Sequence, residues 1–263
     1  MEETLAREFK GKTGVSVKTG RLIGMRFSAK DWYAVFEAEY IEGKAKSNGG
    51  EKMYKIISGR YETGNEEQQM GYKQLFGEDN IQYKFDLYFH WYNLVHEMGH
   101  CLVEKYGVKL SKVQEEMFVN ELAVGYYRYI GETDRLNELE TFLKCVIDQV
   151  PSPVPEGQTF TEFYESIWGT EALMNVMLYG YFQLNSVLEA MKSVKDFTDV
   201  AGAFGIKVKQ AEVKECKDEI LSENAEKYLD TAVENMKAFG FDVPEISLEL
   251  AENPMIQCAQ SDE

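Results

Sequence analysis

The stretch of residues 86–106 constrains the fold most strongly, because its sequence predicts one long and largely buried helix. No proline interrupts it, and Gly107 supplies a common signal for the end of a helix. Apolar residues recur along it at helical spacing, namely Phe89, Leu94, Val95, Leu102 and Val103. A helix with such a face must pack against other elements, so we expect it at the centre of the fold.

The first third of the chain predicts β-strands. Residues 21–27, 32–41 and 53–57 are rich in β-branched and aromatic side chains, and a Ser-Asn-Gly-Gly turn at residues 47–50 precedes the last of them. Residues 59–77 are polar and contain several glycines, which favours a loop. We therefore expect a small antiparallel sheet in this part of the chain.

Helical patterns dominate the remainder. Ser111 can cap a helix that runs to Ile130, because Gln114 stands three residues on, as a capping box requires. Thr133 opens another helix with apolar residues at helical spacing. A proline-rich segment at residues 151–155 predicts a linker or long loop.

Further helices are expected after this linker. The predicted ranges are residues 161–168, 171–194 and 213–239, followed by an extended tail after Pro244. The chain shows no internal repeat, so a repeat architecture is not expected.

The charge of the chain limits its partners. With 45 acidic and 28 basic residues, the formal net charge is −17. Such a chain repels phosphate backbones and anionic lipid surfaces, so we expect neither nucleic acid nor a membrane as a partner. The four cysteines are widely spaced, and no secretory signal or membrane span is visible. We expect a cytoplasmic protein with reduced thiols; the sequence leaves the oligomeric state open.

Within the first predicted helix, His96-Glu97-Met98-Gly99-His100 matches the motif HExxH. Histidines four residues apart lie on one helix face and can reach a single tetrahedral zinc ion. Glu97 stands beside them, where it can take a proton from an attacking water. Two of the chain's three histidines lie in this motif, and a merely structural role would bury three polar groups at a considerable cost.

A catalytic zinc requires a third protein ligand. The longer motif HExxHxxGxxH fails here, because Val103 and Tyr106 occupy its glycine and third histidine positions. The third ligand should therefore be a carboxylate on the next helix, where Glu115, Glu116 and Glu121 are available.

Residues 116–123, Glu-Met-Phe-Val-Asn-Glu-Leu-Ala, resemble the E-x-x-A-N-x-F-A signature of ImmA/IrrE-type metallopeptidases, which are glutamate zincins, or gluzincins. Val119 and Leu122 depart from that signature, and the resemblance covers residues 94–127. It implies that Glu116 is the third zinc ligand. Asn120 lies one turn further on the same helix face, where it can support a ligand from behind.

Other polar and aromatic residues near the motif have more ordinary interpretations. His90 could donate a proton or stabilise an oxyanion, but a supporting or surface position is more common for such a residue. Tyr126 and Tyr127 could supply a hydrogen bond to a reaction intermediate, although core packing explains tyrosines equally well. Cys101 points away from the histidine face, as a buried thiol does.

Together these patterns predict an α+β fold: a small N-terminal antiparallel sheet packed on a mainly helical zincin-like core, with additional C-terminal helices. Residues 1–150 would form the metallopeptidase domain, and residues 151–263 a helical region packed on it within one catalytic unit. Residues 81–85 alternate in polarity and are predicted to form a strand that could align an extended peptide.

The predicted function is a zinc-dependent hydrolase, a metallopeptidase that uses Glu97 as general base on a peptide or protein substrate. The alternative is a binding or regulatory protein that keeps the zincin scaffold without catalysis. A zinc hydrolase that acts on another class of substrate also fits HExxH. The sequence does not choose among substrates.

Overall fold

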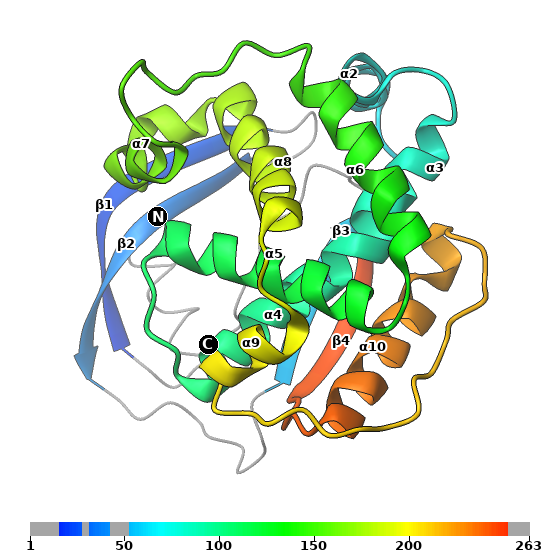
Figure 1. Cartoon of the computed structure of the whole chain (residues 1–263). Helices are drawn as coiled ribbons and strands as arrows, with labels where there is room; N and C mark the ends of the chain where they lie inside the picture. Colours follow the sequence, from blue (N-terminus) through cyan, green and yellow to red (C-terminus); the bar gives the residue numbers. More distant parts are fainter. Residues whose placement is uncertain (1–15, 28–31, 43–52, 252–263) are drawn as a thin grey trace. The chain divides into compact units, whose positions relative to one another are not determined.

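The computed structural model describes residues 16–27, 32–42 and 53–251 (Figure 1). The chain divides into two compact units, Met1–Glu51 and Lys52–Glu263. In the first unit, β1 (Ser16–Phe27) pairs antiparallel with β2 (Trp32–Glu42), from Ser16 opposite Glu42 to Phe27 opposite Trp32. The first two predicted strands are therefore confirmed.

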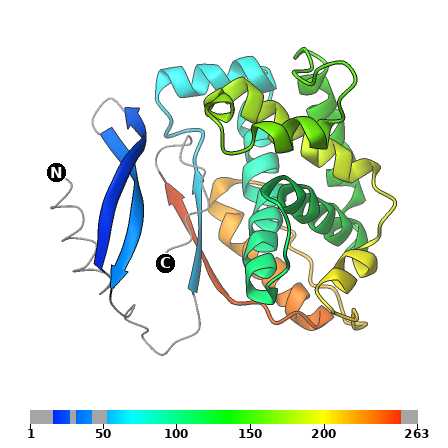
Figure 2. The ribbon, with the colours of Figure 1, turned by 90° about the vertical axis from the view of Figure 1, so that its left-hand side faces the viewer.

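The sheet in the second unit is parallel, which corrects the prediction of an antiparallel sheet packed on the helices. There β3 (Met53–Gly59) pairs with β4 (Glu245–Ala251), and Figure 2 shows the two strands side by side. Within the predicted extended tail, residues 245–251 are described and form β4, and Ile246, Leu248 and Leu250 pack against the core. Parallel pairing requires a long crossover, and the helices of this unit provide it.

Two segments before the motif are helical, contrary to prediction. The expected loop contains α2 (Glu66–Phe76), which Asn65 and Gln68 begin with a capping box. The expected strand at residues 81–85 is α3 (Ile81–Asp86). Its side chains lie among aromatic rings: Phe85 contacts Tyr72 of α2 at a centroid distance of 4.9 Å and Phe89 at 4.4 Å. Tertiary packing has overridden the local alternation.

The predicted central helix is confirmed, with an unexpected irregularity. A π-helical segment, η1 (Leu87–Tyr92), follows α3 directly and continues into α4 (Asn93–Tyr106). Gly107 ends α4 in the left-handed conformation, with φ of 64°. A π-helical segment widens the turn and changes the direction of the side chains around it.

The next two helices agree with prediction. The capping box of Ser111 and Gln114 opens α5 (Lys112–Tyr129). It is followed by α6 (Thr133–Ile147), whose apolar face is buried as its spacing predicts.

The later helices are α7 (Phe160–Ile167), η2 (Glu171–Met174), α8 (Val176–Lys192), α9 (Phe197–Ala203), η3 (Ser222–Asn224) and α10 (Ala225–Phe239). Among them, α7 lies within one residue of the predicted range 161–168, whereas the helices predicted at residues 171–194 and 213–239 are shorter than expected. The helix predicted from residue 213 begins only at Ala225. The buried side chain of Asn235 accepts from the Lys214 amide and donates to the Lys214 carbonyl, which holds that segment in a non-helical conformation.

Helices α4 and α5 form the centre of the larger unit, and their close approach depends on a glycine. A Cβ at Gly99 would lie 2.9 Å from Val119 Cβ, so any larger residue would push the helices apart. Helices α8, α9 and α10 pack around this pair. None of the helices in the described ranges has the length and apolar character needed to cross a membrane.

Candidate metal centre

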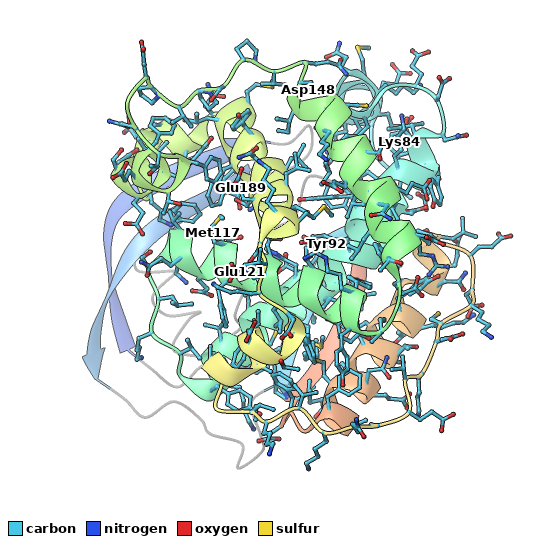
Figure 3. All side chains as sticks on the ribbon, viewed as in Figure 1. Lys84, Tyr92, Met117, Glu121, Asp148 and Glu189 are labelled. Carbon is cyan, nitrogen blue, oxygen red and sulfur yellow. The ribbon has the colours of Figure 1, made fainter. Side chains whose placement is uncertain are left out.

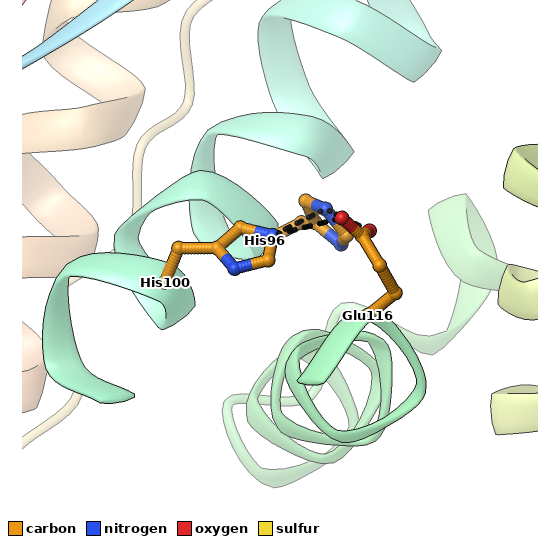
Figure 4. A group of neighbouring side chains, drawn as sticks. All are labelled: His96, His100 and Glu116. Atoms are coloured by element: carbon orange, nitrogen blue, oxygen red, sulfur yellow. Dashed lines mark hydrogen bonds and ion pairs between the residues drawn. The ribbon is translucent and has the colours of Figure 1, made fainter. Parts of the chain in front are cut away.

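The side chains of His96, His100 and Glu116 converge between α4 and α5 (Figure 4). The two Nε2 atoms of the histidines lie 3.3 Å apart. Glu116 Oε2 lies 3.4 Å from His96 Nε2, and Glu116 Oε1 lies 3.6 Å from His100 Nε2. Of the three carboxylates considered on α5, Glu116 is the one brought to the histidine pair as a third ligand group.

The opposite nitrogen of His96 is held by an amide. His96 Nδ1 lies 3.0 Å from Asn120 Oδ1, and the Asn120 amide nitrogen donates to the Glu116 carbonyl at 2.9 Å. The same Oδ1 also accepts from the Tyr92 hydroxyl at 2.9 Å. Because Asn120 Oδ1 is an acceptor, His96 Nδ1 carries the proton and its Nε2 lone pair points toward Glu116.

The opposite nitrogen of His100 is held by a carboxylate. His100 Nδ1 lies 2.8 Å from Glu115 Oε1, and Lys112 Nζ lies 3.2 Å from Glu115 Oε2. The hydrogen bond from His100, against partial burial, lowers the pKa of the Glu115 carboxyl. A carboxylate behind a metal-ligating imidazole fixes its tautomer and raises its basicity.

The two imidazoles and the Glu116 carboxylate therefore point into one small space, where a positive charge would be stabilised. Burial would lower the pKa of His100, but hydrogen bonds to Glu115 and Glu116 outweigh it and raise that pKa to about 10. Burial would raise the pKa of the Glu116 carboxyl, yet the two imidazoles hold it well below its ordinary value. In the metal-free protein, a proton on His100 supplies the positive charge.

The spacing of the three groups fits a metal ion as well as a proton. Two ligand atoms bound to one tetrahedral zinc lie roughly 3.3 Å apart at usual bond lengths. The observed separations of 3.3, 3.4 and 3.6 Å are close to that value without rearrangement. His96 is buried, with 3% exposure, whereas the His100 and Glu116 side chains are 17% and 15% exposed, so the cluster lies at the edge of the core. The cluster could hold a metal ion, and its two nitrogens and one carboxylate suit zinc.

Glu97 lies beside the cluster and is oriented by its own helix. Asn93, one turn earlier, donates from its side-chain nitrogen to Glu97 Oε1 at 3.0 Å. The negative charge of Glu97 also contributes to the raised pKa of His100. Glu97 thus has a carboxylate that Asn93 orients and that lies within electrostatic range of His100.

Several residues considered from the sequence lie outside this cluster. Glu121, labelled in Figure 3, pairs with Lys195 at 2.7 Å. The Tyr127 hydroxyl donates to the Trp91 carbonyl, and the Tyr126 hydroxyl accepts from Asn235.

His90 and Cys101 also have structural partners. His90 is buried between Asp86 Oδ1, 2.6 Å from its Nδ1, and the Gly59 carbonyl, 3.0 Å from its Nε2. The Cys101 thiol donates to the Glu97 carbonyl, as in an ordinary buried helix position.

Sequence reasoning missed the supporting roles of Glu115, Tyr92 and Asn93. Asn93 stands four residues before Glu97, a spacing that could have indicated the contact. Glu115 was considered only as a ligand, and its contact with the outer side of His100 requires the packing angle of α4 on α5. Tyr92 reaches Asn120 across the same interface.

Comparison with known proteins gives no independent identification. No family model matches the chain, and neither the curated proteins nor the solved structures include a match. The resemblance to ImmA/IrrE-type metallopeptidases therefore stays a prediction from the motifs.

Proposed function

We propose that this protein is a zinc-dependent hydrolase, specifically a metallopeptidase that acts on a peptide or protein substrate. The observation that carries the proposal is the convergence of His96, His100 and Glu116 at the spacing of a tetrahedral zinc ligand set. Glu97 beside this cluster supplies the basic group that a hydrolase also needs. A purely structural cluster would not require a separate, oriented carboxylate at that position.

Each residue of the chain has a role in this proposal. When bound, zinc supplies a Lewis acid that polarises a substrate carbonyl and favours deprotonation of a water molecule. Glu97 accepts the proton of the attacking water and returns it to the leaving amine. Asn93 keeps the Glu97 carboxylate in position, while Asn120 and Glu115 hold His96 and His100 with their Nε2 atoms inward.

The proposal is tested first by metal content and then by turnover. We expect about one zinc per chain in wild-type protein. Glu116→Ala should lose it, whereas the control Glu121→Ala, on the same helix, should keep it. Glu97→Gln should retain zinc but lower peptide hydrolysis by about 10²–10⁴-fold. Elemental analysis and a peptide-library assay provide the measurements.

Two results would count against the proposal at different levels. Full hydrolysis by folded, zinc-loaded Glu97→Gln would exclude Glu97 as the general base. A wild-type protein that holds no zinc and takes up none on titration would exclude the metal centre, and would favour a non-catalytic protein that keeps this scaffold.

A further inference from the structure

Tyr88 occupies a distinctive place relative to the candidate metal centre. It lies in η1, and the row Tyr88, Tyr92, His96 and His100 repeats every four residues along the continuous helix. Its ring stacks on that of Tyr92 at a centroid distance of 6.2 Å and an interplanar angle of 26°. Since the Tyr92 hydroxyl contacts Asn120 behind His96, this row extends from the metal ligands to Tyr88.

The Tyr88 hydroxyl differs from those of other buried tyrosines. Tyr92, Tyr127 and Tyr164 each donate a hydrogen bond to a protein oxygen. Tyr88 is only 3% exposed, yet it makes no hydrogen bond to another residue in the described ranges. A buried tyrosine hydroxyl usually has a protein partner, so the Tyr88 hydroxyl is unusual in being free to bind a ligand.

The hydroxyl is also accessible from outside. Within residues 53–251, the fully enclosed polar side-chain atoms without a partner are Ser58 Oγ and Arg60 Nε. The Tyr88 hydroxyl is not among them, so the small exposed part of this side chain includes its oxygen. A ligand atom can therefore reach the phenol although the ring is buried.

Tyr88 lies within electrostatic range of carboxylates of the candidate metal centre. Burial raises the pKa of Tyr88 well above its ordinary value, and the neighbouring Tyr179 adds to this effect. The carboxylates of Glu116 and Glu97 raise it further. These carboxylates come from the two helices that form the metal centre, and they keep the phenol protonated as a hydrogen-bond donor.

We propose that the Tyr88 hydroxyl donates a hydrogen bond to the substrate carbonyl oxygen as this oxygen becomes negatively charged during attack by water. This inference rests on the proposed peptidase function and identifies the donor that such a reaction requires. A preorganised donor at a developing oxyanion commonly contributes about 10²–10³-fold to the rate. Tyr88 would keep its proton throughout, and Glu97 would carry the transferred proton.

A kinetic comparison of two buried tyrosines tests the proposal. Tyr88→Phe should keep its zinc and its thermal stability, because the removed hydroxyl has no protein partner. Its kcat should fall about 100-fold, with a much smaller change in KM. The control Tyr126→Phe removes a hydroxyl that bonds to Asn235 away from the site, so it should keep wild-type kcat.

A binding measurement provides a readout that does not depend on turnover. A peptide phosphonate presents charged oxygens like those of the tetrahedral intermediate, whereas a peptide thiol binds zinc through sulfur without needing a donor. By calorimetry, Tyr88→Phe should bind the phosphonate at least about tenfold more weakly than wild type. Its affinity for the thiol should stay unchanged.

The outcomes separate the role of Tyr88 from the proposed function. Wild-type kcat and phosphonate affinity in Tyr88→Phe would overturn the role of Tyr88 and leave the peptidase proposal intact. An equal loss for phosphonate and thiol would also overturn it, since it would indicate a distorted site. If zinc-loaded wild type cleaves no peptide and binds neither compound, the proposed function fails, and the role of Tyr88 fails with it.

Discussion

Adjacent glutamates on α5 have different tasks at the candidate metal centre. Glu116 faces the space between the two imidazoles, whereas Glu115 contacts the outer nitrogen of His100. A helix rotates by about 100° per residue, so neighbouring side chains cannot occupy the same position around one metal. The chemical identity of the two residues therefore says little about which of them is the ligand.

The supporting role of Glu115 can be measured separately. Glu115→Gln keeps a similar shape but replaces the charged acceptor behind His100 by a neutral one. We expect it to bind one zinc with affinity about 10–100-fold lower than wild type. A competition titration against a chelator measures this, with Glu121→Gln as the matched control; equal affinities for both variants and wild type would contradict the role.

The pH dependence of zinc binding follows from His100. Its pKa is raised from 6.5 to about 10 in the metal-free fold, so zinc must displace a proton below pH 10. Affinity should therefore rise about tenfold per pH unit between pH 7 and 9. Titrations at several pH values, in two buffers of different ionisation enthalpy, would measure the affinity and the released proton; a flat profile would contradict this prediction.

The raised pKa of His100 weakens zinc binding at low pH, but at low pH it stabilises the metal-free fold. A proton bound more tightly in the folded state stabilises it fully below pH 6.5, and this contribution is lost as the pH rises through about 10. The lowered pKa values of Glu115 and Glu116 contribute above pH 4.5 and are lost in acid. The cluster therefore stabilises the metal-free protein most between pH 4.5 and pH 6.5.

At the scale of elements, a buried pair joins η1 to the sheet. His90 contacts the carboxylate of Asp86 on one side and the Gly59 carbonyl of β3 on the other. Both ring nitrogens of His90 therefore face oxygen atoms of neighbouring residues. Gln82 donates to the second oxygen of Asp86 at 2.9 Å. The pair thus fixes β3 against the continuous helix that carries the candidate metal ligands His96 and His100.

Breaking this pair should destabilise the fold. Both side chains are 0% exposed, and loss of one partner leaves the other without a buried hydrogen bond. We expect Asp86→Asn to lower the free energy of unfolding by about 1–3 kcal/mol. Denaturant unfolding measures this, with Glu138→Gln as control, because Glu138 makes only an exposed hydrogen bond to Tyr83. Similar stabilities for the two variants would show that the pair contributes little.

Elements with local signals could be predicted from sequence, and those that depend on distant contacts could not. The capping box of Ser111 and the stop at Gly107 act within a few residues, so α4 and α5 were predictable. Residues 81–85 fit both a strand and a helix, because Ile81 and Phe85 lie on one face in either case. Residues 81–85 form a helix because Phe85 packs against aromatic side chains of neighbouring helical segments, a contact that the local sequence does not reveal.

The same distinction holds for the candidate site. HExxH is local, so its two histidines and Glu97 could be named from the motif. The choice of Glu116 needed the resemblance, since local sequence offers three similar carboxylates on one helix. Tyr88 gave no sequence signal among 16 tyrosines, and its significance depends on a missing hydrogen-bond partner that only the structure reveals.

At the scale of the whole molecule, the parallel pairing of β3 with β4 affects the order of folding. The sheet joins residues 53–59 to residues 245–251, and a ribosome completes such a contact only after most of the chain has emerged. The candidate metal ligands instead lie within residues 96–116, on consecutive helices. The nascent chain can therefore assemble the helix pair of the candidate metal centre before the strand that closes the sheet has been synthesised.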